Sequence, residues 1–160
     1  MPKIDVAKAP VRTTTIYPEE FKHVCHGREK AALGNVAGLT QFGVNLTRLK
    51  PGTASALRHW HENEDEFVFV IEGELVLIED DGEVLLKPGD AAGFKAGVPN
   101  GHHLINKANR DAVYLEVGTR APSEHAHYPD VDLDFIREAN GTMRLSHKSG
   151  EPYRLSLIHI

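Results

Sequence analysis

Residues 52–73 read GTASALRHWHENEDEFVFVIEG and carry the most specific chemical pattern in the chain. His59 and His61 are two residues apart, so on an extended strand their imidazoles point to one face while Trp60 points away. The polar turn ENED leads to Glu66, which opens the apolar run FVFVI, so a neighbouring strand can bring its carboxylate beside both imidazoles. Two imidazoles and one carboxylate with open positions suit a divalent transition metal.

A second histidine group, His102 and His103, lies on a segment of its own and supplies candidates for a further ligand. Neighbouring residues on a strand face opposite sides, so only one of these two imidazoles can reach the metal. An HxH pair alone is weak evidence, because the 160 residues include ten histidines. The combination of the pair, the carboxylate and the second group is what favours a metal site.

At this point the chain resembles the cupin superfamily, whose first motif is glycine, HxH, three or four residues, Glu, six residues, glycine. The chain matches this motif with Gly52, His59, His61, Glu66 and Gly73, with one extra residue between the first glycine and the first histidine. That insertion leaves the spacing of the ligands intact and alters only the incoming turn.

The second cupin motif is glycine, five residues, PxG, two residues, His, three residues, Asn, and residues 89–106 match it less closely. Lys95 replaces the proline, and strict counting places the last ligand on Asn100. A two-residue insertion places it on His102, with Asn106 at the family's spacing. Imidazole binds first-row metals better than an amide does, so we prefer His102. His103 remains the alternative.

The rest of the sequence predicts many short strands joined by tight turns. The clearest runs are LTQFGVNLTRL at 39–49, EFVFVI at 66–71, ELVLIE at 74–79 and AVYLEVGT at 112–119. Such a series is typical of a sandwich or barrel. If Glu66 faces inward, Val68 and Val70 do too, and Phe67 and Phe69 take the opposite face. Brief helical turns are expected only in YPEEFKHV and DLDFIREA, at 17–24 and 132–139.

The resemblance implies an all-β, cupin-type jelly-roll β-barrel or sandwich with N- and C-terminal extensions. We expect an N-terminal arm at 1–34, a cupin barrel at 35–118, and a C-terminal extension at 119–160 that packs on or near the barrel. A small terminal hairpin is predicted around Ser149 and Gly150. The final LSLIHI, at 155–160, is unusually apolar for a chain end.

The extension contains a second HxH pair, His125 and His127. No carboxylate follows this pair at the spacing found after His61, although Asp130 and Asp132 are near. We therefore interpret these two histidines as structural rather than as metal ligands.

Composition limits the partners. The formal net charge is −5 and acidic residues are spread over turns, so neither nucleic acid nor an anionic membrane is an expected partner. No apolar run is long enough to cross a bilayer and no signal peptide is evident, which predicts a cytoplasmic protein. Cys25 is the single cysteine and has no partner within the chain for a disulfide. Cupin barrels commonly pair, and we expect a homodimer.

The site residues implied by the resemblance are His59, His61, Glu66 and His102, holding a divalent transition metal such as Fe, Mn, Ni or Zn. This set predicts a metal-binding cupin that acts as a small metal-dependent enzyme, an oxygenase or an isomerase, on a small polar organic substrate. The alternative is a non-catalytic cupin that binds a small molecule or uses the metal structurally.

Overall fold

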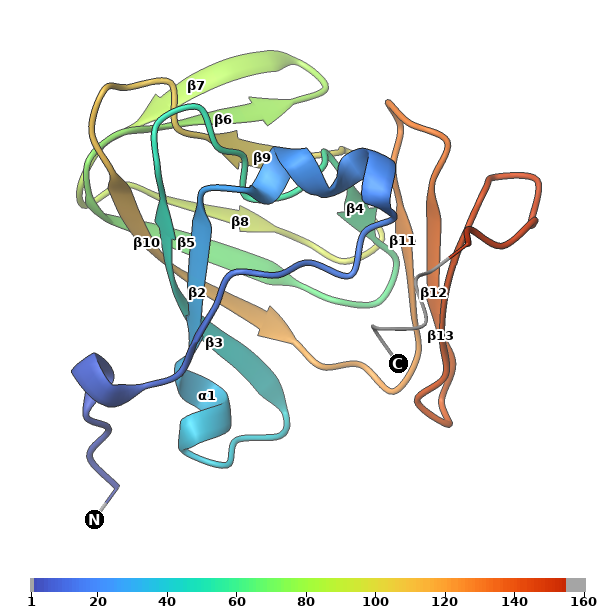
Figure 1. The fold of residues 1–160 in the computed structure, drawn as a ribbon, viewed down its shortest axis with the longest axis horizontal. Helices are drawn as coiled ribbons and strands as arrows, with labels where there is room; N and C mark the ends of the chain where they lie inside the picture. Colours follow the sequence, from blue (N-terminus) through green and yellow to red (C-terminus); the bar gives the residue numbers. More distant parts are fainter. Residues whose placement is uncertain (1, 155–160) are drawn as a thin grey trace.

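The computed structural model describes residues 2–154, whose strands form three antiparallel sheets (Figure 1). The six-stranded sheet has the order β1-β2-β3-β10-β5-β8, with bounds Val11–Arg12, Arg28–Ala32, Phe42–Leu49, Ala112–Thr119, Glu66–Glu72 and Ala91–Phe94. The three-stranded sheet has the order β7-β6-β9, with bounds Gly82–Leu86, Leu75–Glu79 and His103–Ile105. The four-stranded sheet has the order β13-β12-β11-β4, with bounds Met143–Ser146, Asp134–Arg137, Glu124–His127 and Trp60–His61. The expected all-β architecture is confirmed.

The main core contains side chains from the six-stranded and three-stranded sheets. Alternation along β5 decides which residues enter it: Val68 and Val70 are 6% and 0% exposed, whereas Phe67 and Phe69 are 43% and 39% exposed. The expected inner and outer faces are therefore confirmed. The buried members of this core are Leu49, Val68, Val70, Leu75, Leu77, Leu86, Leu104, Ala112 and Tyr114.

A tight turn between β5 and β6 depends on Gly73. This glycine has a φ of +71°, and an added Cβ would lie 2.5 Å from the backbone oxygen of Asp111 and 2.8 Å from the Cα of Ala112. Only a residue without a side chain tolerates both the positive φ and the close approach. The last glycine of the first motif thus has a structural reason.

A second apolar cluster joins the N-terminal segment to the four-stranded sheet. It contains Tyr17, Cys25, Ala126, Tyr128, Leu133 and Leu145, and the rings of Tyr17 and Tyr128 meet edge to face at 5.9 Å. The predicted turn in YPEEFKHV is the 3₁₀ helix η2, Glu19–Cys25. Through this cluster η2 packs on the C-terminal strands.

The predicted helical turn in DLDFIREA is wrong, because Asp134–Arg137 forms strand β12. This strand pairs with β11 on one side and β13 on the other, including Ala126 with Phe135 and Phe135 with Leu145. A helix here would leave both neighbouring strands without these hydrogen bonds, so tertiary pairing overrides the weak local preference.

The remaining helical elements are short: η1 spans Val6–Lys8 and α1 spans Leu33–Val36. Among residues 2–154, no helix has the length and apolar character needed to span a membrane. The predicted terminal hairpin is present, with Ser146 bridging Pro152 around the turn. The LSLIHI segment, which drew attention in the sequence, lies outside the described residues.

Candidate metal centre

The candidate metal ligands come from segments belonging to all three sheets. His61 ends β4 of the four-stranded sheet, and Glu66 begins β5 of the six-stranded sheet. His59 and His102 form a two-way backbone bridge, with N–H to O distances of 3.2 and 2.9 Å, and His102 directly precedes β9 of the three-stranded sheet. The fold therefore brings together residues that are up to 43 positions apart, from His59 to His102.

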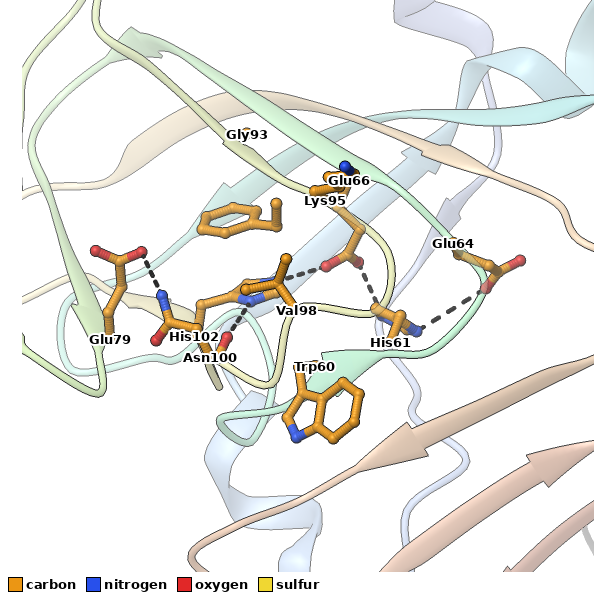
Figure 2. Close-up of a pocket in the computed structure, with 11 residues that line it drawn as sticks. Trp60, His61, Glu64, Glu66, Glu79, Gly93, Lys95, Val98, Asn100 and His102 are labelled. Carbon is orange, nitrogen blue, oxygen red and sulfur yellow. Dashed lines mark hydrogen bonds and ion pairs between the residues drawn. The ribbon is translucent and has the colours of Figure 1, made fainter.

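The imidazoles of His59, His61 and His102 approach the Glu66 carboxylate through their Nε2 atoms. Figure 2 shows His61 and His102 on either side of Glu66. Nε2 of His102 lies 2.6 Å from Oε2, Nε2 of His61 lies 3.2 Å from Oε1, and Nε2 of His59 lies 4.0 Å from Oε2. The three histidine side chains are only 7 to 16% exposed. The sequence-predicted residues His59, His61, Glu66 and His102 thus form one largely buried cluster.

Backbone carbonyls determine which ring nitrogen carries the proton in two of these histidines. Nδ1 of His59 lies 2.6 Å from the carbonyl oxygen of Leu57, and Nδ1 of His102 lies 3.3 Å from that of Asn100. A carbonyl oxygen only accepts, so each Nδ1 donates and each neutral ring keeps its Nε2 lone pair facing Glu66. Two acceptors 2.6 Å apart, Nε2 of His102 and Oε2 of Glu66, need a proton or a cation between them.

The surroundings of the His61 imidazole indicate whether these four side chains fit a metal. Neither ring nitrogen of this buried imidazole has a hydrogen-bond partner among the described residues. Its Nδ1 lies 4.0 Å from Oε1 of Glu64 and 3.9 Å from Oε2 of Glu124, so nearby negative charge favours the N–H at Nδ1. Nε2 then has an unused lone pair directed toward Glu66, and a divalent transition ion would supply the missing partner. The residues present fit a bound metal.

The electrostatics of the cluster keep charge on the carboxylate and off His59. Burial, reinforced by two neighbouring imidazoles, lowers the pKa of His59 to about 4. Burial alone would raise the pKa of Glu66, but the imidazoles of His102 and His61 hold it well below its ordinary value. Burial opposes charge on His61 too, yet three adjacent carboxylates, that of Glu66 foremost, raise its pKa. An ionised carboxylate and a neutral imidazole are the forms that bind metals.

The structure brings His102, and not His103, to Glu66. Nδ1 of His103 lies 2.7 Å from the carbonyl oxygen of Ala56, and burial lowers the pKa of this imidazole. The motif asparagine, Asn106, has a structural role. Its fully buried amide donates to the carbonyl oxygens of Leu49 and Arg110, both at 2.8 Å.

Two carboxylates behind His61 were missed in the sequence. The Glu124 side chain is fully buried and accepts the backbone N–H groups of Glu62 at 2.9 Å, Asn63 at 3.2 Å and His125 at 2.8 Å. Glu64, which belongs to the polar turn ENED, pairs with Arg137 at 2.9 Å. No local signal marks Glu124, because two of its three partners lie about 60 positions earlier in the chain.

A pocket of about 210 Å³ lies over the cluster (Figure 2). Phe94 stacks flat on His102, with ring centroids 3.6 Å apart and an angle of 2°. The pocket combines this apolar wall with carboxylate, amide and ammonium groups. The residues that line it are Trp60, His61, Glu64, Glu66, Glu79, Gly93, Phe94, Lys95, Val98, Asn100 and His102.

Comparison with known proteins agrees with this geometry. Residues 45–118 match the cupin domain model. A sugar phosphate isomerase from Silicibacter pomeroyi has a similar structure, with a TM-score of 0.90, 44% identity and 98% of each chain covered. An oxalate-binding protein from Thermotoga maritima is 29% identical over 116 residues, which cover 67% of this chain and 90% of the relative.

A more distant structure, the polyketide cyclase RemF from Streptomyces resistomycificus, shares the fold alone, with a TM-score of 0.62, 17% identity, and coverage of 74% of this chain and 79% of that one. One scaffold therefore supports different chemistries, and the family does not define the reaction. The matched domain, the full-length structural similarity and the histidine and glutamate motif together make this chain a member of the cupin superfamily.

Proposed function

We propose that this protein is a metal-dependent isomerase that acts on a small sugar phosphate or a related hydroxycarbonyl compound. The observation that carries the proposal is the pocket of about 210 Å³ that opens onto the convergent imidazoles and Glu66. Pockets for larger ligands occupy roughly 300–1,000 Å³, so a substrate of a few carbon atoms fits best. The similarity to a sugar phosphate isomerase along almost the whole chain supports this reaction over an oxygenase.

His59, His61, Glu66 and His102 would hold the ion, which as Fe, Mn, Ni or Zn would supply Lewis acidity to a substrate oxygen. The chain contributes fixed ligand orientations, since backbone carbonyls hold the Nδ1 atoms of His59 and His102. The buried environment keeps His59 neutral, with a pKa of about 4, and so available as a ligand near neutral pH.

Isomerisation moves a proton between neighbouring carbon atoms, and we assign this transfer to Glu79. Its Oε1 accepts the Asn100 amide at 3.1 Å, which fixes the carboxylate at the pocket wall. Glu64 also lines the pocket, but its Oε2 already accepts from Arg137 and from the backbone N–H of Ala121, both at 2.9 Å. Glu79 has no such ion pair among the described residues, so we prefer it as the base.

The remaining pocket residues position the substrate. Lys95 lines the pocket and is exposed at its rim, where its ammonium group can pair with a phosphate or another anion. Trp60, Phe94 and Val98 supply the apolar wall that excludes water from the reacting atoms.

The experiment combines metal analysis with a substrate panel. The purified protein is expected to contain at least one metal per chain. When loaded, it should interconvert an aldose and a ketose phosphate, followed by proton NMR. Glu66→Gln should lose both metal and activity. Glu79→Gln should retain the metal and lose roughly 10²-fold or more in kcat. Full activity in the metal-free protein, or an unchanged kcat in Glu79→Gln, would contradict the assigned roles.

A second candidate function is non-catalytic binding of a small dicarboxylate at the same ion. The similarity to an oxalate-binding protein over 67% of the chain favours it. Calorimetric titration of the metal-loaded protein with oxalate separates the two candidates. Saturable oxalate binding without turnover of any sugar phosphate, and without oxygen uptake, would replace the isomerase proposal by this one.

A further inference from the structure

The second histidine pair, His125 and His127, lies beside a carboxylate from a distant part of the sequence. Strand β11 alternates in burial, so Glu124 and Ala126 point inward while the two histidines share the more exposed face. Their rings stack with centroids 4.0 Å apart. Because β4 pairs with β11, Glu62 lies next to this face, and its N–H donates to the carbonyl oxygen of His125.

One oxygen of Glu62 faces both imidazoles. Its Oε1 lies 2.7 Å from Nε2 of His127 and 3.5 Å from Nδ1 of His125. On the far side of the ring, Nε2 of His125 lies 2.6 Å from Oδ1 of Asp134. A carboxylate only accepts, so this Nε2 carries the proton and Nδ1 keeps its lone pair facing Glu62. A carboxylate behind a ligating histidine is a recurrent arrangement in protein metal sites.

Packing fixes the second ring as well. The indole of Trp60 stacks on His127 with centroids 4.3 Å apart and an angle of 15°. The side chains of Glu62, His125 and His127 remain 44%, 29% and 31% exposed, so solvent reaches the point where they converge. Possible ligand atoms of these three residues all lie within 4.8 Å of one another. By the same rule, Nε2 of His127 donates its proton to Oε1 of Glu62 when no ion is bound, and a metal would take the place of that proton. Two oriented imidazoles and a carboxylate, open on one side, then supply the ligands for a divalent transition ion.

We propose that Glu62, His125 and His127 form a second divalent transition metal site, with Asp134 as the residue that positions His125. This site shares no residue with the cluster around Glu66. Glu62 directly follows His61 in the chain, so an ion here would tie the end of β4 to β11. The sequence interpretation of the pair as structural considered only the residues that follow the pair, whereas the nearby carboxylate, that of Glu62, comes from the residue after β4.

Counting bound ions tests the proposal. The protein, freed of metal by a chelator, is titrated with Co²⁺ alone, and the equivalents bound are measured by calorimetry and by visible absorption. The wild type should bind one equivalent more than His127→Ala. The control is His147→Ala, which removes a partly exposed imidazole whose Nδ1 lies 2.8 Å from Oδ2 of Asp132, and it should match the wild type.

Two conservative variants separate a loss of metal binding from a loss of folding. Glu62→Gln preserves side-chain shape but replaces the charged ligand, and Asp134→Asn leaves all three ligands in place. Each should weaken this binding step by about 10- to 100-fold while circular dichroism of the metal-free protein is unchanged. Equal equivalents in the wild type and His127→Ala would overturn the proposal. If the central cluster bound no metal, the wild type would bind one equivalent and His127→Ala none, so failure at one site does not conceal the other.

Discussion

Removing the Glu124 carboxylate should lower the free energy of unfolding, and the hydrogen bonds that this carboxylate accepts determine by how much. This fully buried side chain accepts three backbone N–H groups, those of Glu62, Asn63 and His125, at 2.8 to 3.2 Å. Hydrogen bonds to a charged group contribute about 1.5–3 kcal/mol each. In the variant the N–H of Glu62 can still donate to the carbonyl oxygen of His125, 3.1 Å away, and the N–H of Asn63 lies in an exposed turn where it can bind water. The buried charge also no longer has to be desolvated.

The expected loss in the free energy of unfolding is therefore about 3 kcal/mol for Glu124→Ala, well below the sum of three bonds. Glu124→Gln keeps one acceptor oxygen and should lose about 1–2 kcal/mol. Because Glu124 fixes the backbone directly after His61, metal affinity in Glu124→Gln should also fall, by about tenfold.

Urea unfolding followed by circular dichroism measures these differences, and metal titration of the same samples measures the affinity. The matched control is Glu83→Ala, which removes an exposed carboxylate, 54% accessible, that pairs with Lys107. That change should cost less than about 0.5 kcal/mol. If Glu124→Ala were no more destabilising than Glu83→Ala, the carboxylate would not anchor the turn and the reasoning would be refuted.

Three further outcomes are expected. Burial lowers the pKa of His59 to about 4 from its unfolded value of about 6.5. Between these two pKa values the unfolded chain binds a proton at His59 that the folded chain does not bind. The free energy of unfolding therefore decreases by up to about 3 kcal/mol as the pH falls through this range. Urea midpoints of the metal-free protein at pH 7 and pH 4.5 should differ less in His59→Asn, and an equal loss in both would contradict the assignment. Gly73→Ala should destabilise by about 2–4 kcal/mol. Gly38→Ala is the control: Gly38 has a φ of +72° but nothing lies within 4 Å of the new Cβ, so this variant measures the cost of the positive φ alone. If both variants lost the same free energy of unfolding, the backbone clash at Gly73 would be excluded as a cause. The exposed side chains of Phe67 and Phe69 on β5 favour the expected homodimer, which light scattering after size exclusion should detect and which a strictly monomeric protein at micromolar concentration would rule out.

Local sequence patterns were sufficient for most of the barrel. The alternation of FVFVI assigned Val68 and Val70 to the core and Phe67 and Phe69 to the surface, because side-chain direction on a strand has a strict period of two. The same rule placed His59 and His61 on one face.

Patterns failed where the local preference was weak. Asp134–Arg137 forms a strand because two neighbouring strands hydrogen-bond to it, and neither partner is visible in residues 132–139 alone. Between the adjacent His102 and His103, the sequence could state only that one faces the site. The bridge between His59 and His102 determines which one, because it sets the two strands in register.

The sequence by itself determined the cupin motif, the strand-rich fold and the central group of His59, His61 and Glu66, since each depends on spacing within a short segment. Only the tertiary structure decided which other side chains contact this group and the segments next to it. Glu124 reaches the backbone after His61, and Glu62 reaches His125 and His127, because β4 and β11 pair although more than 60 residues separate them in the chain. Pairing between distant strands is set by the packing of the whole core, and no short stretch of sequence contains that information.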